Sequence, residues 1–158
     1  MENFFLKEKI LKANNKNFKY IEKGEGNLVL LVHGWPESCH SWLNQIFFIS
    51  NLGFKVVAIN VRGYADSYSP HSIQSYKLKF FMEDIIDIIN YFNKENAILI
   101  GHDWGAPICW TTAAYYKKKI TAVIGLSVPF TRRGKISSTR LWQKLYKNIF
   151  FYQNYFQY

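Results

Sequence analysis

The sequence predicts an α/β fold in which a mostly parallel sheet is flanked by helices. Short apolar runs typical of buried strands alternate at least three times with longer segments whose apolar residues recur at helical period. The strand-like runs are continuously apolar, as expected for parallel strands covered on both faces. A length of 158 residues predicts one domain. In such sheets, ligands bind at the carboxyl ends of the strands.

The first predicted elements are a β-hairpin and a buried strand. Residues 4–12 and 17–23 flank a turn rich in asparagine, a residue that favours turns needing positive φ. Residues 23–26 contain two glycines and predict a second turn. Residues 27–32 form the first continuously apolar strand.

Strands and helices then alternate to the end of the predicted sheet. Ser38 is placed to cap a helix, and Gly53 to stop it. Lys117 to Lys119 are expected to close the last helix of the series, where cations favour the helix dipole. The predicted elements are a helix over 39–51, a strand over 55–61, a helix over 76–93, a strand over 96–100, a helix over 107–119 and a buried strand over 120–126.

The stretch Gly101-His102-Asp103-Trp104-Gly105-Ala106 joins a predicted strand to a predicted helix. Gly101 and Gly105 flank Asp103 at the spacing of a G-x-nucleophile-x-G turn, which pushes the central side chain out above a sheet. A Cβ at either glycine would crowd the strand against the helix. A carboxylate in this position can attack an alkyl carbon and form an ester. The alternative is a solvated aspartate in a glycine-rich turn.

The net charge of +9 is unevenly distributed. Residues 1–103 hold 11 basic and 11 acidic side chains, whereas residues 104–158 hold 9 basic and no acidic ones. One interpretation is a basic tail for nucleic acid or an anionic membrane. We favour the other, that acidic counterparts lie in a further C-terminal portion, because no nucleic-acid fold signature is present. The prediction is therefore no nucleic-acid partner.

The two cysteines, Cys39 and Cys109, lie far apart and form no CxxC or Cys/His ligand spacing. This pattern predicts no metal site and two buried free thiols in a reducing compartment. The N-terminus lacks the apolar core of a signal peptide, and no run approaches the ~20 apolar residues of a membrane span. We expect a cytoplasmic protein without a membrane span. No cofactor is expected.

With these motifs, the chain resembles the α/β-hydrolase fold and, within it, the epoxide hydrolases, over roughly residues 17–157. The resemblance rests on four motifs in the right order. They are His33-Gly34-Trp35-Pro36-Glu37, similar to the family's HGxPE loop; Arg62-Gly63-Tyr64-Ala65-Asp66-Ser67, similar to its RGYGxS loop with Ala65 for the usual glycine; Gly101-His102-Asp103-Trp104-Gly105, similar to its nucleophile elbow; and Tyr152-Gln153-Asn154-Tyr155-Phe156-Gln157, similar to a cap segment.

The resemblance implies hydrolysis of a small apolar epoxide through an alkyl-enzyme ester. Asp103 would attack an epoxide carbon while Tyr152 and a second cap tyrosine protonate the leaving oxygen. A histidine oriented by a second acid would then activate water. Backbone N–H groups of Trp35 and Trp104 would hold the oxyanion. His33, Gly34, Pro36, Gly101 and Gly105 would have structural roles.

The sequence lacks part of this machinery, since no Asp, Glu or His follows Asp103. In this fold the second acid and the histidine come after the nucleophile. We therefore expect the N-terminal part of an epoxide-hydrolase-like protein, unable to turn over substrate by itself. Residues 1–130 would form part of the core and residues 131–158 the start of a helical cap. The last strands and the second cap tyrosine would also be missing.

Two other functions remain open. A haloalkane dehalogenase-like hydrolase also uses an Asp nucleophile followed by Trp, but usually carries Asn in the place of Trp35 and lacks the Tyr152 pattern. A non-catalytic remnant, or one half of a split protein, would instead bind a partner such as a complementing C-terminal half.

Among the histidines, His33 is expected to pack its loop rather than act as a base, and His102 to be structural. His40 and His71 are expected at the surface.

Overall fold

The computed structural model of the protein describes residues 6–130. Within them six strands form one sheet in the order β1-β2-β4-β3-β5-β6. The elements are β1 (Lys9–Ala13), β2 (Lys16–Lys23), β3 (Asn27–Val32), the 3-10 turn η1 (Cys39–Trp42), α1 (Leu43–Asn51), β4 (Phe54–Ile59), the 3-10 turn η2 (Ile73–Tyr76), α2 (Leu78–Tyr91), β5 (Ala97–His102), α3 (Gly105–Tyr115) and β6 (Ile120–Leu126). None of the helices in this part of the chain is both long and apolar enough to span a membrane.

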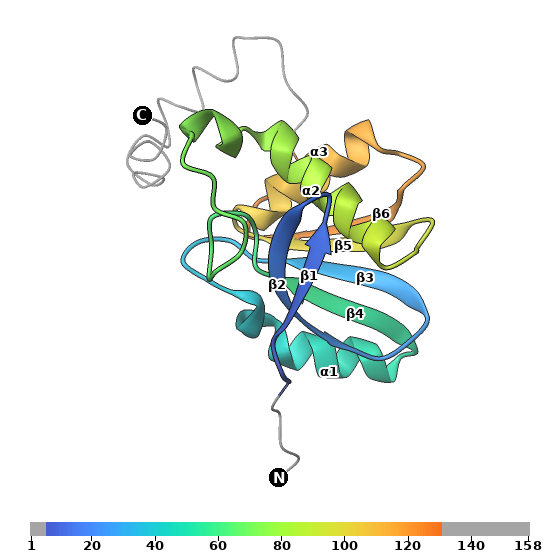
Figure 1. The fold of residues 1–158 in the computed structure, drawn as a ribbon. Coiled ribbons are helices and arrows are strands. Elements are labelled where there is room, and N and C mark those ends of the chain that lie inside the picture. Colours follow the sequence, from blue (N-terminus) through green and yellow to red (C-terminus); the bar gives the residue numbers. More distant parts are fainter. Residues whose placement is uncertain (1–5, 131–158) are drawn as a thin grey trace.

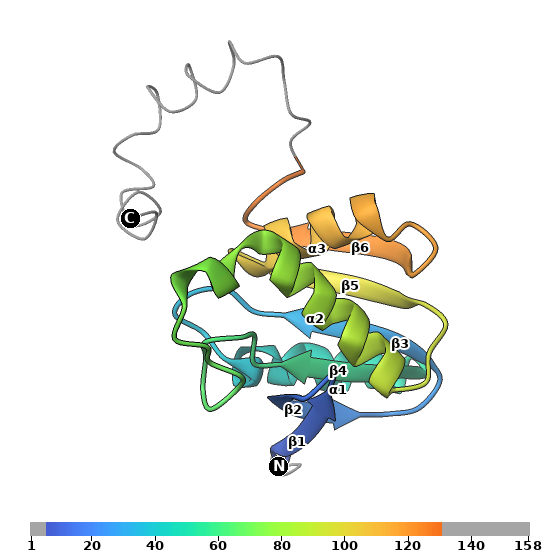
Figure 2. The ribbon, with the colours of Figure 1, turned by 45° about the horizontal axis from the view of Figure 1, so that its top comes forward.

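The predicted α/β class is confirmed. Strands β4, β3, β5 and β6 run parallel, and β1 and β2 join them as an antiparallel hairpin. Helix α1 covers one face of the sheet, and α2 and α3 cover the other (Figures 1 and 2). In β3, Leu28, Leu30 and Val32 belong to the core under α2 and α3, whereas Val29 and Leu31 face the core under α1. Both faces of this central strand are thus buried, as its continuous apolar run predicted.

The predicted hairpin is confirmed, with Ala13 paired to Lys16 across its turn. Asn14 and Asn15 both adopt positive φ, at 48° and 60°, the conformation for which asparagine was expected. The first strand begins at Lys9 rather than at residue 4. Residues 1–5 lie outside the described part of the chain.

Several predicted boundaries were wrong for local reasons. The helix predicted over 39–51 is a capped 3-10 turn followed by α1, and the helix predicted from residue 76 starts only at Leu78. Strand β4 stops at Ile59 instead of reaching Val61, whose amide donates to Nε2 of His33 and not to a neighbouring strand. Helix α3 ends at Tyr115, so the three lysines over 117–119 follow the helix instead of closing it.

The prediction of a buried strand over 120–126 has the right bounds but the wrong environment. Among the described residues, β6 lies at the edge of the sheet and pairs with β5 alone. Ile124 and Leu126 are therefore 49% and 42% exposed. An apolar run indicates that a strand can be buried, but it does not indicate which segments cover that strand.

Candidate active site

Asp103 lies on a tight turn between β5 and α3. Its φ is 49°, in the left-handed region that non-glycine residues rarely adopt. The turn is fixed on both sides, because the Asp103 amide donates to the carbonyl of Leu126 (3.3 Å) and its carbonyl accepts from the amide of Ala106 (3.0 Å). A Cβ on Gly101 would lie 2.4 Å from the carbonyl oxygen of Gly105, and a Cβ on Gly105 would lie 2.0 Å from that of Val32. The packing thus agrees with the reason predicted for both glycines, that a Cβ at either position would crowd the strand against the helix.

The sheet order brings Trp35 to Asp103 from 68 residues away. Strands β3 and β5 are parallel neighbours with Val32 opposite Gly101, so the loops after them meet at one edge. The Trp35 amide donates a hydrogen bond to Oδ1 of Asp103 over 3.0 Å. Between them Gly34 passes so closely that a Cβ there would lie 2.4 Å from the Asp103 Cβ. Only glycine allows this approach.

His33 is buried, and both of its ring nitrogens bind backbone groups. Nδ1 donates to the carbonyl of Gly34 (2.7 Å), and Nε2 accepts from the amide of Val61 (3.2 Å). This arrangement requires the neutral imidazole, and burial lowers the pKa of His33 in the same direction. With both nitrogens engaged, His33 has no free position for proton transfer, in keeping with a loop-packing role.

A second contact ties the two loops together beside the site. His102 Nδ1 lies 2.9 Å from Oε2 of Glu37, and both side chains are about one-third exposed. Tyr64, from the loop after β4, packs edge-to-face on His33 with ring centroids 5.0 Å apart, and burial, followed by the charge of Asp103, raises its pKa. Three loops at the carboxyl edge of the sheet thus surround one half-buried carboxylate.

Trp104 is the N-cap residue of α3, next to the first turn, where helix N–H groups have no intrahelical acceptors. The positive end of the helix dipole lies at the same place and favours a negative charge next to it. The backbone of this turn can therefore stabilise an oxyanion on the Asp103 side. The indole is 38% exposed, and that of Trp35 is 45% exposed.

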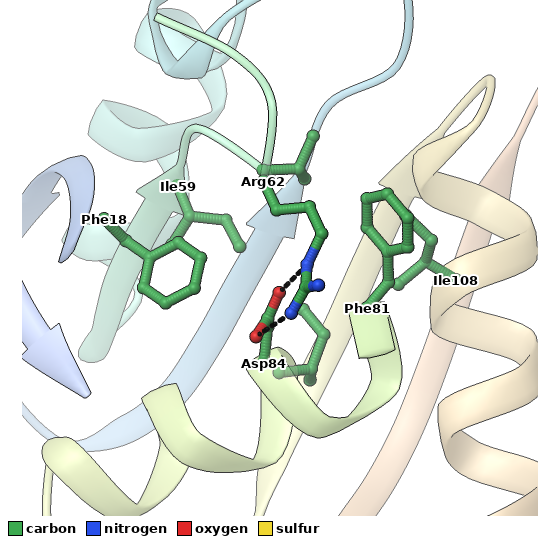
Figure 3. Close-up of a pocket in the computed structure, with 8 residues that line it drawn as sticks. Phe18, Ile59, Arg62, Phe81, Asp84 and Ile108 are labelled. Atoms are coloured by element: carbon green, nitrogen blue, oxygen red, sulfur yellow. Dashed lines mark hydrogen bonds and ion pairs between the residues drawn. The ribbon is translucent and has the colours of Figure 1, made fainter. Parts of the chain in front are cut away.

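The sequence did not predict a buried ion pair next to the site. Arg62, after β4, binds Asp84 of α2 through two hydrogen bonds, Nε to Oδ2 (2.7 Å) and Nη2 to Oδ1 (2.8 Å). The pair lines a small pocket of about 10 Å³ whose other walls include Phe18, Phe81 and Ile108 (Figure 3). This volume is below the roughly 300–1,000 Å³ typical of ligand sites. The pair therefore has a structural role. Arg62 and Asp84 lie 22 residues apart on different elements, and no local pattern in the sequence indicated that they would meet.

The structure brings together most of the predicted site residues. Trp35, Asp103 and Trp104 meet at the carboxyl edge of β3 and β5, supported by His33, Gly34, Pro36, Gly101 and Gly105. Tyr152 lies outside the described residues, as do the rest of the predicted cap and the predicted boundary after residue 130.

Comparison with known proteins identifies the family. A profile of the alpha/beta hydrolase fold matches residues 27–157. This chain belongs to the α/β-hydrolase fold family. Among curated proteins it is similar to epoxide hydrolase B of Mycobacterium tuberculosis, with 41% identity over 112 residues, which are 71% of this chain and 32% of that protein. It is also similar to bifunctional epoxide hydrolase 2 of Sus scrofa, with 36% identity over 87% of this chain and 25% of that protein.

Solved structures show the same relationship for this α/β hydrolase. Epoxide hydrolase A from Mycobacterium thermoresistibile superposes with a TM-score of 0.82 at 34% identity, over 89% of this chain and 45% of that one. An epoxide hydrolase from Vigna radiata gives 0.80 at 36% identity, over 89% and 46%. The chain is thus epoxide-hydrolase-like, and it spans between a quarter and a half of the length of these relatives.

Proposed function

We propose that this chain carries the nucleophile of an epoxide-hydrolase-like enzyme, and that Asp103 attacks an epoxide carbon. A carboxylate oxygen forms the new C–O bond, the epoxide C–O bond breaks, and the leaving oxygen takes a proton. The product is an alkyl ester on Asp103. The hydrogen bond from the Trp35 amide to Oδ1 of Asp103 is the observation that carries this proposal.

That hydrogen bond supports two stages of the reaction. Before attack, it holds Oδ1 and so fixes the orientation of the Asp103 carboxylate. After attack, hydrolysis of the ester would create an oxyanion on the same carboxyl carbon. The Trp35 amide is then already within hydrogen-bonding distance of it, and we assign the second donor to the Trp104 amide at the start of α3.

The remaining groups are assigned from the resemblance. Tyr152 is proposed to protonate the leaving oxygen, together with a second tyrosine from the predicted cap. No Asp, Glu or His follows Asp103, so the acid and the base for ester hydrolysis would come from further sequence or from a complementing chain. The 158 residues alone should therefore form the ester and stop.

The free, buried Cys39 and Cys109 agree with a reducing compartment such as the cytoplasm.

Intact-protein mass spectrometry after incubation with styrene oxide, a small apolar epoxide, tests this proposal. We expect one covalent equivalent on the wild-type chain and none on Asp103→Asn. Asp66→Asn is the matched control, because Asp66 is a carboxylate 82% exposed on a neighbouring loop. It should react like wild type. An adduct that persists in Asp103→Asn would contradict the assignment of the nucleophile.

The same chain distinguishes the dehalogenase alternative. The relatives named above are epoxide hydrolases, which favours an epoxide over a haloalkane. Incubation with 1-chlorobutane should release no chloride above the Asp103→Asn background. Stoichiometric chloride release by wild type would support the dehalogenase instead.

A further inference from the structure

Glu8, Cys39 and His40 meet beside η1, where Cys39 is buried, Glu8 is half-buried and His40 is exposed. Glu8 precedes β1, whereas the other two residues start the 3-10 turn more than 30 residues later. The Cys39 sulfur lies 3.8 Å from Nδ1 of His40, which lies 3.7 Å from Oε1 of Glu8. All three atoms fall within 4.8 Å of one another. The sequence spacing gave no hint of this cluster, because Glu8 arrives only through the fold.

We propose that Glu8, Cys39 and His40 bind one zinc-like divalent cation, with a fourth position open to water. A tetrahedral zinc ion with one sulfur, one nitrogen and one oxygen ligand places these atoms roughly 3.4–3.6 Å apart. The Cys39–His40 and His40–Glu8 separations need to shorten by only a few tenths of an ångström. The Cys39–Glu8 separation, which is within 4.8 Å, needs to shorten by up to about 1 Å, a movement that the half-buried Glu8 side chain can make. Thiolate and imidazole ligands select zinc over magnesium or calcium, which prefer oxygen alone.

The turn that carries two of the ligands is held in place by its own hydrogen bonds. The Cys39 amide donates to Oδ1 of Asn60 (2.6 Å), a buried side chain after β4. The Ser38 hydroxyl accepts from the His40 amide (3.4 Å), and the Ser38 carbonyl accepts from the Ser41 amide (3.1 Å). Thiol and imidazole are therefore presented from a fixed backbone, which lowers the entropic cost of binding an ion.

Lys19 sets the orientation of the third ligand. Its ammonium group lies 3.3 Å from Oε2 of Glu8 and 2.8 Å from Oδ2 of Asp66. One oxygen of Glu8 is thereby occupied, and the other, Oε1, faces His40. Glu8 would bind the cation through that single oxygen. Asp66 also pairs with Lys19, and its negative charge reduces the repulsion between the Lys19 ammonium group and the bound cation.

Binding exchanges a proton for the metal. Cys39 is buried, and burial raises the pKa of its thiol to about 11. The S–H bond breaks, its proton leaves to the buffer, and the electron pair forms the sulfur–metal bond. The exposed His40 provides the entry path, since its side chain is 46% accessible.

Titration of the full 158-residue chain with Co²⁺ tests the site, because cobalt bound to a thiolate gives a sulfur-to-metal charge-transfer band. We expect one Co²⁺ per chain with this band, and competition by Zn²⁺. Cys39→Ala should abolish the band. His40→Gln and Glu8→Gln should each weaken binding at least about tenfold. His40 is exposed, so its replacement leaves the fold intact and keeps the test valid if Cys39→Ala destabilises the chain.

Matched controls separate this site from adventitious binding. Cys109→Ala removes the other buried thiol, on α3, and His71→Gln removes an exposed histidine; neither residue belongs to the cluster. Both variants should bind Co²⁺ like wild type. Binding without a charge-transfer band, no binding, or a band that survives Cys39→Ala would each overturn the proposal. The result is independent of epoxide chemistry, since no step of the test uses Asp103.

Discussion

At the scale of single residues, the site depends on backbone positions that few side chains tolerate. Asp103 holds a φ of 49°, and strain of this kind at a non-glycine residue costs about 1–3 kcal/mol. The glycine spacing in the sequence predicted this turn. The hydrogen bond from Trp35 was harder to predict, because it requires β3 and β5 to be neighbours in the sheet.

Gly34→Ala tests the close approach of the two loops. Its Cβ would lie 2.4 Å from the Asp103 Cβ, so one loop must move. We predict a loss of about 1–3 kcal/mol in the free energy of unfolding, measured with urea. The displaced carboxylate should also react with styrene oxide at least tenfold more slowly. Gly53→Ala is the control: its Cβ meets nothing within 4 Å, so strain at φ 85° should lower stability while the reaction rate is kept.

His33 predicts how stability depends on pH. Burial lowers its pKa below 6.5, so only the unfolded chain takes up a proton as the pH falls past that value. The free energy of unfolding should therefore be fully present above pH 6.5 and decline on acidification below it. Urea titrations at pH 7.5 and 5.5 measure this loss. It should shrink in His33→Gln and persist in His71→Gln; an unchanged loss in His33→Gln would exclude His33 as its source.

At the scale of elements, the sequence located strands and helices well and their ends less well. The bounds of β6 matched the prediction, but its exposure did not, since burial depends on neighbours distant in sequence. Likewise, nothing local indicated that Arg62 would hold α2 through Asp84. Lys16, at the hairpin turn, also binds Asp84 (2.6 Å), so one buried carboxylate joins three segments.

Arg62→Met measures what this joint contributes. Removing one partner of a buried ion pair typically costs about 3–5 kcal/mol, because the other charge stays buried. We expect a loss of that size in urea unfolding. Lys9→Met is the comparison, since Lys9 is 52% exposed where it pairs with Glu22 and should contribute about 0–1 kcal/mol. Equal losses in the two variants would show that the Arg62 pair does not join the elements as described.

At the scale of the whole molecule, the family could be predicted from four short motifs, and the comparisons agree with them. The motifs are local, and each of the three within residues 6–130 lies on a turn whose chemistry its own residues determine. The sheet order, the edge position of β6 and the meeting of Glu8 with Cys39 are long-range features that no local pattern encodes. The described residues supply the proposed nucleophile, Asp103, and the Trp35 amide that donates to it. These groups account for the first half of the proposed catalytic cycle, the formation of the ester.

The most direct test of this account is to count, for the 158-residue chain with styrene oxide, the equivalents bound to protein and the free diol released over time. We predict one bound equivalent per chain, lost in Asp103→Asn, and no diol above the uncatalysed rate. Repeated diol formation that depends on Asp103 would contradict the claim that the chain lacks the base for ester hydrolysis. No bound equivalent and no diol would contradict the claim that Asp103 is the nucleophile.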